Sequence, residues 1–418
     1  MMRAIVLVLD HLSAKYLGPY GNTWVPTPGF NQLATHALLA ETMIASSNHL
    51  DELYTSYLLG QHPLCPLREP QALLNSLVEK GGTSTLISSS MDVMSLPVCA
   101  QFNQHLHIPL EVCSEPAESI ESTAMAGFVG EVLHWLDSTQ PPNREDLLWI
   151  HSSSLENVWD APVALREIFR GSEDPEASTI TAPPHVHQDT PLDPDALLQI
   201  SYPYAAQICV IDTCLAALWN WLAATPADDP TLLLVTAARA LPLGIHGDVG
   251  YENAPLYTDQ IHVPLFASIL GGQKNQPAMS RVQKILQSES IYHTLMQWFD
   301  LESNTQTDLP AAQHSLLPWI RCLDETDTTP NTTLDSQWAV SKNSQCPETA
   351  IYTPAWFAKM VDNRVTELFV KPDDRWDINE IAPLREDVQA AIEEFMAAGN
   401  TSANHQKLPE ILWNQLIR

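Results

Sequence analysis

Short apolar runs recur along the chain, each followed at once by polar residues, and they predict buried strands. The first run is Arg3–Leu9, which is rich in Ile and Val and ends at Asp10 and His11. Unbroken apolar runs of this length are typical of strands buried on both faces. Four further runs have a similar length and pattern, at residues 41–47, 84–88, 146–151 and 232–236. In open α/β sheets, polar residues at the carboxyl end of a central strand are where ligand chemistry is placed. Asp10 also fits a plainer interpretation, in which it only caps the next helix.

Between these runs, apolar residues recur at helical spacing. Helices are predicted at residues 30–39, 70–80, 124–136, 204–222 and 383–395. The segment 204–222 is long and amphipathic. Gly81-Gly82 ends the helix at 70–80, because glycine is preferred at helix C-termini. The polar, proline-rich residues 171–198 are predicted to form a long surface loop.

Strands and helices that alternate in this way predict an α/β fold with a mostly parallel central sheet flanked by helices. Near the C-terminus, residues 350–354, 356–361 and 364–370 predict an antiparallel hairpin around an Asp362-Asn363 turn. We therefore expect an α/β domain at residues 1–320 and a smaller α+β subdomain, with the hairpin and a terminal helix, at residues 321–418.

Charge narrows the range of partners. The chain has 418 residues, of which 50 are acidic and 20 are Lys or Arg, giving a formal charge of −30. This excess argues against nucleic acid or an anionic membrane as a partner, and it fits a protein kept soluble by its acidity.

The N-terminus has no signal-peptide cleavage site, and no apolar run is expected to span a membrane, so we expect a cytoplasmic protein. Seven cysteines follow no metal-binding spacing.

Several motifs resemble those of the sulfatases. Asp10-His11-Leu12, Leu17-Gly18-Pro19-Tyr20-Gly21 and the segment 27–34 resemble the opening of that family. The helix 204–222, the segment 257–265 and Glu367-Leu368-Phe369 resemble later family motifs in the same order. The resemblance covers nearly the whole chain and implies an alkaline phosphatase-like fold. It also implies a sulfuric ester hydrolase that uses calcium or magnesium, a nucleophile made from cysteine, cationic side chains and an acid–base histidine.

The residues at the family's nucleophile motif do not fit that chemistry. The cysteine position holds Leu50, and the proline and arginine positions hold Glu52 and Tyr54. Cys65 is the nearest alternative, but it comes 15 residues too late in the motif. The resemblance therefore implies a site without its nucleophile.

The family's metal and substrate positions have changed as well. Asp10 keeps the first metal-binding aspartate, whereas His11 replaces the second, so the two form at most a weak remnant of a metal site. The remaining positions that line the family's pocket are occupied by Ser89, Glu156, Ala238, Arg239, His246 and Asn253. Arg239 stands where the family has a metal ligand, and we expect it to pair with Asp10 and lower the pKa of that carboxyl.

The leading hypothesis is a catalytically inactive sulfatase-like protein, a pseudoenzyme that binds a partner. The partner would be an unknown protein or a small anionic ligand, and no cofactor is expected. The second hypothesis is a sulfuric or phosphoric ester hydrolase with a rebuilt site that holds zinc or another transition metal. Its ligands would come from Asp10, His11, His49, Asp51, Glu52, Glu156 and His246. A third is an ordinary sulfatase with displaced motifs. His185 and His187 form a weaker metal candidate.

Overall fold

The computed structural model describes residues 2–65, 71–138, 146–188, 190–224, 230–250, 254–271, 279–301, 315–321, 338–399 and 408–415. Within these ranges a large sheet has the strand order β4-β3-β5-β1-β6-β8-β2-β7, with β9 also paired to β2. Its strands are β1 (Arg3–Leu9), β2 (Leu38–Ile44), β3 (Thr83–Ser88), β4 (Gln104–His107), β5 (Asp146–Ser152), β6 (Thr231–Thr236), β7 (His262–Val263), β8 (Leu265–Leu270) and β9 (Ser280–Gln287).

β1 lies in the middle of this sheet and runs parallel to both of its neighbours. Ile5 stands opposite Leu148 of β5 and Leu233 of β6. All residues of β1 after Arg3 are at most 3% exposed, because both faces of the strand are covered. The predicted central strand is confirmed, as is the prediction that the runs at 146–151 and 232–236 belong to the same sheet.

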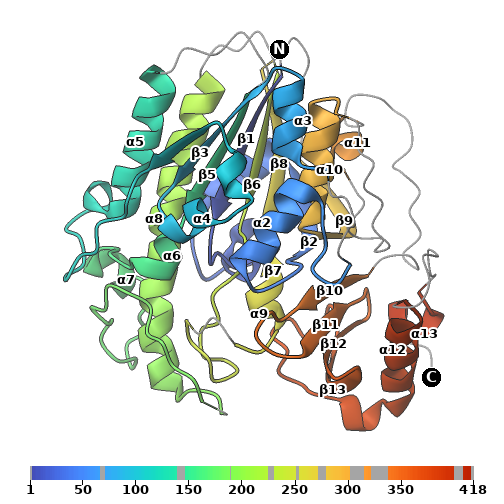
Figure 1. The fold of residues 1–418 in the computed structure, drawn as a ribbon. Coiled ribbons are helices and arrows are strands. Elements are labelled where there is room, and N and C mark those ends of the chain that lie inside the picture. Colours follow the sequence, from blue (N-terminus) through green and yellow to red (C-terminus); the bar gives the residue numbers. More distant parts are fainter. Residues whose placement is uncertain are drawn as a thin grey trace.

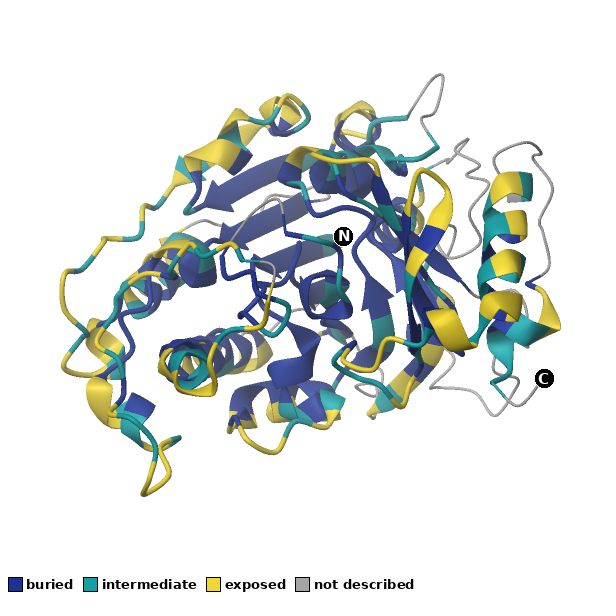
Figure 2. Cartoon of the chain, turned by 90° about the horizontal axis from the view of Figure 1, so that it is seen from below, coloured by how far each residue is buried: buried dark blue, intermediate teal, exposed yellow. Residues whose placement is uncertain are grey.

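Helices cover both faces of the large sheet (Figure 1). They are α1 (Pro28–Thr35), α2 (Leu50–Leu59), α3 (Leu73–Glu79), α4 (Met91–Ser95), α5 (Ala124–Ser138), α6 (Ser154–Asn157), α7 (Val163–Glu167), α8 (Pro194–Ala224), α9 (Thr258–Ile261), α10 (Glu289–Trp298) and α11 (Leu317–Arg321). α5 and α8 lie on one side, and α2, α3, α10 and α11 lie on the other (Figure 1). In Figure 2 the central strands of the large sheet are buried, and exposed residues lie mostly on loops and on the outer sides of helices.

α8 differs most from its predicted form. It begins at Pro194, although the sequence predicts a loop to residue 198 and a helix from residue 204, and Pro203 lies inside it. Proline usually interrupts a helix, but here Tyr202 and Tyr204 are buried and hold both sides of Pro203 in the core. By length and composition α8 could cross a membrane, contrary to the sequence prediction, and 72% of its most apolar window is buried inside the protein. This burial is that of a core helix.

The boundary between α1 and β2 also differs from its prediction. α1 ends at Thr35 and β2 starts at Leu38, whereas the sequence predicts a helix to residue 39 and a strand from residue 41. Leu38, Leu39 and Ala40 are buried in the sheet. Their apolar side chains fit a helix face and a buried strand equally well, so periodicity alone does not place the boundary.

A second, four-stranded antiparallel sheet forms near the C-terminus, in the order β10-β11-β12-β13. Its elements are β10 (Ala339–Lys342), β11 (Glu348–Tyr352), β12 (Trp356–Val361) and β13 (Arg364–Val370), followed by α12 (Glu386–Gly399) and α13 (Glu410–Trp413). The predicted hairpin is confirmed in β12 and β13. This sheet and its helices have their own buried apolar cluster, which includes Trp356 and Ile392. The predicted domain boundary at residue 321 adjoins residues 322–337, which lie outside the described ranges.

β10 joins the small sheet to the carboxyl end of β2. The backbone N–H of Lys342 donates to the Ser46 carbonyl at 3.0 Å, and the Ser341 hydroxyl donates to the Ala45 carbonyl at 2.5 Å. The Gln287 side chain, at the end of β9, donates to the Val340 carbonyl at 2.7 Å. The small sheet is thereby fixed beside the edge of the large sheet that carries the polar strand ends.

A buried carboxylate ties α1 to α8. Asp212 of α8 accepts hydrogen bonds from the backbone N–H groups of Gly29, at 2.8 Å, and Phe30, at 2.7 Å. These are N–H groups of the first turn of α1, which have no partner inside the helix. The helices approach so closely that a Cβ at Gly29 would lie 2.4 Å from the Asp212 carbonyl oxygen.

Replacing this carboxylate should weaken the fold. We expect Asp212→Ala to lower the free energy of unfolding by about 2 kcal/mol, since two buried N–H groups lose their acceptor. Urea denaturation midpoints measure the change. Glu131→Ala on the exposed side of α5 is the matched control and should have little effect. Equal losses in the two variants would show that the Asp212 contact does not stabilise the fold.

Candidate functional site

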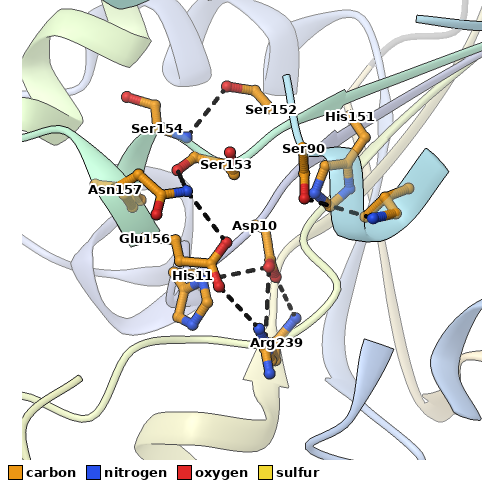
Figure 3. A network of polar contacts seen from close by, with 12 residues as sticks. Asp10, His11, Ser90, His151, Ser152, Ser153, Ser154, Glu156, Asn157 and Arg239 are labelled. Atoms are coloured by element: carbon orange, nitrogen blue, oxygen red, sulfur yellow. Dashed lines mark hydrogen bonds and ion pairs between the residues drawn. The ribbon is translucent and has the colours of Figure 1, made fainter. Parts of the chain in front are cut away.

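Polar residues meet where β1, β5 and β6 end. Asp10 and His11 follow β1, Glu156 lies on α6 just after β5, and Arg239 comes three residues after β6. The three strands are parallel neighbours, so their carboxyl ends bring these residues to one edge of the sheet. Figure 3 shows Arg239 pointing toward Asp10 and Glu156, with His11 against Asp10. We call Asp10, His11, Glu156 and Arg239 the Asp10 cluster.

Asp10 is held from the main chain and from two side chains. It is 1% exposed, and its own N–H donates to the Ser152 carbonyl at 2.9 Å. Its Oδ1 accepts the backbone N–H of Arg239 at 3.3 Å. Its Oδ2 lies 3.2 Å from His11 Nδ1 and 3.6 Å from Arg239 Nε, both ion-pair contacts without hydrogen-bond geometry.

His11 adopts a backbone conformation that is uncommon for a residue with a side chain. Its φ is +65°, in the left-handed region, where non-glycine residues are rare and are held by their surroundings. The His11 carbonyl accepts a hydrogen bond from the Tyr204 hydroxyl at 2.8 Å, and His11 forms a β-bridge with Ala240. These contacts fix the turn after β1 with the imidazole against Asp10.

The Arg239 guanidinium spans the cluster. It is 4% exposed; Nη1 donates to the Asn48 carbonyl at 3.0 Å, and Nη2 donates to Glu156 Oε1 at 3.3 Å. The prediction that Asp10 and Arg239 lie within side-chain reach is confirmed. The guanidinium makes no hydrogen bond to Asp10, because the terminal nitrogens of Arg239 are directed to Asn48 and Glu156 instead.

These contacts decide the charge of Asp10. Burial by itself raises the pKa of the Asp10 carboxyl, but His11 and Arg239 together hold that pKa well below its usual range. Asp10 is therefore ionised at neutral pH, and the Arg239 guanidinium supplies its counter-charge. The expected direction of the pKa shift agrees with the structure.

The resemblance implies a divalent metal, and the Asp10 cluster is where its ligands would lie. Asp10, His11 and Glu156 each offer one ligand atom, and these atoms lie within 4.8 Å of one another. Calcium and magnesium need six or more oxygen ligands, and here the Arg239 cation contacts both carboxylates. A second cation in the same place would be repelled. With Arg239 in this position the residues do not fit calcium or magnesium.

One wall of the site is formed by a residue that is not among the candidates chosen from the sequence. His151, at the end of β5, is buried, and its Nδ1 lies 2.8 Å from the Tyr54 hydroxyl, which accepts from Trp149 Nε1 at 3.2 Å. Burial lowers the pKa of His151 to about 4, against the attraction of Asp10, so the ring is neutral at pH 7. Its place at the end of a strand beside β1 is the signal that identifies it. Among the predicted pocket residues, Tyr54 borders this wall.

Ser89 and Ser153 lie beside the ends of β3 and β5. Their hydroxyl oxygens are 3.0 Å apart, and Ser89 Oγ also accepts the backbone N–H of Ser153 at 2.8 Å. In the described part of the chain, neither hydroxyl is hydrogen-bonded to a histidine. Among the described residues, no histidine is therefore placed to activate either serine as a nucleophile.

Other predicted residues have partners elsewhere. Leu50 is the first residue of α2 and follows His49, which occupies the N-cap, while Asp51 is exposed. Glu52 forms an ion pair of 2.6 Å with Lys342 of β10. His246 stacks on Tyr257 at 3.5 Å between ring centroids, and its Nε2 lies 3.1 Å from the Trp376 carbonyl oxygen.

The remaining candidates do not lie together. Ala238 is buried beside Arg239, and Asn253 lies outside the described residues. His185 contacts the Gly250 carbonyl, and His187 lies 2.6 Å from Asp248. Cys65 forms a β-bridge with His62, and residues 66–70 after it lie outside the described ranges. Among the described residues, a group of three possible metal ligands is formed by Asp10, His11 and Glu156.

Comparison with solved structures identifies the fold. No family model matches the sequence, and no curated protein matches it either. The phosphonate monoester hydrolase of Agrobacterium radiobacter superposes with a TM-score of 0.71 and 15% identity over 96% of each chain. The phosphonate monoester hydrolase SpPMH from Silicibacter pomeroyi gives 0.68 and 13% over 95% of each chain. A putative sulfatase from Bacteroides thetaiotaomicron gives 0.65 and 13% over 99% of this chain and 96% of its own. The chain therefore has the fold of these phosphonate monoester hydrolases and of this putative sulfatase.

The Arg239 contacts predict a specific pattern of stabilities. Arg239→Ala should lower the free energy of unfolding by about 3–5 kcal/mol, since it leaves buried Asp10 without its arginine partner. The double variant Asp10→Asn/Arg239→Ala should regain part of that loss, because the uncompensated charge is removed. Denaturant midpoints of both single variants and the double variant measure the coupling. Strictly additive losses would show that the two side chains do not stabilise each other.

Proposed function

We propose that this protein is a sulfatase-like pseudoenzyme that binds a partner and does not hydrolyse sulfate or phosphate esters. Fold alone does not carry function, so the proposal rests on the Asp10 cluster. The observation that supports it is the Arg239 guanidinium in contact with both Asp10 and Glu156. This contact supplies the positive charge that a metal would otherwise bring to the carboxylates.

Two further features favour an inactive site. Leu50 stands at the position of the family's nucleophile and carries no nucleophilic atom. Neutral His151 is engaged with Tyr54 rather than with a serine hydroxyl. Ester hydrolysis needs a nucleophile, a way to activate it and stabilisation of the developing charge. Of these three requirements, the Asp10 cluster meets only part of the third, the stabilisation of the developing charge.

A rebuilt transition-metal hydrolase is the second candidate. It is favoured by the three ligand atoms of Asp10, His11 and Glu156 within 4.8 Å, a mixed set of nitrogen and oxygen ligands that suits zinc. It requires the Arg239 side chain to leave both carboxylates. This is the feature that separates the two candidates.

Activity assays test the proposal directly. Purified full-length protein should not accelerate the hydrolysis of aryl sulfates, phosphate monoesters or phosphonate monoesters, with or without added calcium, magnesium, manganese or zinc. Turnover that disappears in Cys65→Ala but persists in the control Cys113→Ala would place the nucleophile at Cys65 and contradict the proposal. Turnover that disappears in Asp10→Asn would support the second candidate.

Metal content separates the two candidates without an activity assay. We expect purified protein incubated with zinc and then desalted to retain no stoichiometric metal by elemental analysis, because Arg239 neutralises the ligand carboxylates. Arg239→Met should retain more zinc than the wild type if the guanidinium is what excludes the ion. Stoichiometric zinc in the wild type that is lost in Asp10→Asn would contradict the pseudoenzyme proposal.

A further inference from the structure

A pocket of about 470 Å³ opens between the large sheet and the segment that follows β13. Its walls come from residues 15–21, from β2, β7 and β9, and from residues 371–375. None of the residues that line it belongs to the Asp10 cluster. Its volume falls within the range of roughly 300–1,000 Å³ that is usual for small-molecule sites.

Positive charge gathers on these walls. Four cationic residues line the pocket, Lys15, Arg281, Lys371 and Arg375, against one acidic residue, Glu41. The whole chain has the opposite balance, with 50 acidic and 20 basic residues. A concave surface lined by one sign of charge concentrates ligands of the other sign.

Two of the cations have no ion pair within the described part of the chain. Lys15 is 1% exposed, and its Nζ donates to the Thr258 hydroxyl at 2.8 Å. Arg375 donates from Nη2 to the Lys15 carbonyl at 2.9 Å, and its guanidinium lies 5.9 Å from the centre of the Trp376 ring. Burial lowers the pKa of Lys15 to about 8, although Asp377 and Asp259 act in the opposite direction. A buried cation without a direct counter-charge is costly.

The other two cations each have a carboxylate partner. Lys371 pairs with Asp377, a buried carboxylate behind the pocket wall that also accepts from the Thr258 hydroxyl. Arg281 Nη1 lies 3.7 Å from Glu41 Oε1, and this partly exposed pair is of a kind that contributes little to stability. Positive charge therefore remains in excess, and it comes from several walls at once.

We propose that this pocket binds a small molecule through a tetrahedral oxyanion, a phosphate or sulfate group. Arg281 and Arg375 line the pocket with planar N–H forks, and the buried ammonium groups of Lys15 and Lys371 add positive charge from within its walls. Cationic groups on several walls suit an anion with three or four accepting oxygens better than a planar carboxylate. Tyr20 and Tyr352 line the remaining space and offer ring surface to the rest of the ligand. The site does not depend on whether the Asp10 cluster is catalytic.

Calorimetric titration of the full chain with inorganic phosphate, sulfate and acetate at low salt tests this site. Phosphate or sulfate should bind at a single site per chain, and acetate should bind much more weakly. The double variant Arg281→Ala/Arg375→Ala should lower the affinity by about tenfold or more. The matched control is Arg364→Ala/Arg170→Ala, which removes two arginines elsewhere on the surface and should leave binding unchanged.

Phosphate bound more tightly than sulfate would indicate a phosphate ester as the ligand group, and the reverse order a sulfate ester. Failure of both anions to bind, equal binding of acetate, or unchanged affinity in the Arg281→Ala/Arg375→Ala variant would overturn the proposal.

A second variant tests the buried cation by a different readout. Phosphate should raise the thermal unfolding midpoint of the wild type, since a ligand that binds only the folded state stabilises it. Lys15→Met keeps the length of the side chain and removes the ammonium group. Its unfolding midpoint should be at least that of the wild type and should not respond to phosphate. A midpoint that still rises with phosphate as in the wild type would overturn the role of Lys15. If Lys15→Met fails to fold, the arginine double variant still decides the proposal.

Discussion

The contact between buried Asp10 and Arg239 is the interaction on which the site at the sheet edge depends. Asp10 ends the central strand, where both faces are covered and water does not reach the carboxylate. An ionised group in that position needs a positive neighbour. Here the chain supplies it from the end of β6, the parallel neighbour of β1, and the same guanidinium also reaches Glu156 after β5. One side chain thus joins the ends of three strands.

The frame of the fold and the chemistry of the site are separable in this protein. The frame depends on apolar strands and on helix contacts such as that of Asp212 with α1, and it superposes on hydrolases at 13–15% identity. The chemistry depends on a few polar side chains at the strand ends. Positive charge is scarce in this chain. In the part of the chain that the structure describes, Arg239 brings one positive charge to the strand ends, and four cations gather around the pocket beside residues 371–375. The first is neutralised by carboxylates, whereas the second has positive charge in excess.

The sequence predicts the frame better than the contacts. The runs at 3–9, 146–151 and 232–236 are predicted correctly because a doubly buried strand has an unmistakable apolar pattern. The proximity of Asp10 and Arg239 follows from the arrangement of these strands, since both residues come shortly after parallel neighbouring strands.

Which atoms meet could not be predicted, because this depends on rotamers and on distant segments. Glu52 pairs with Lys342, which lies 290 residues further along the chain, and His246 is drawn away by stacking on Tyr257. The start of α8 could not be predicted because a buried proline in a helix looks locally like a helix stop. The most direct test of the central claim is a crystal structure of the protein soaked in manganese, with anomalous scattering data collected. We expect the Arg239 guanidinium to contact Asp10 and Glu156, with no anomalous peak between Asp10, His11 and Glu156. A strong peak there, with Arg239 turned away from both carboxylates, would contradict the account.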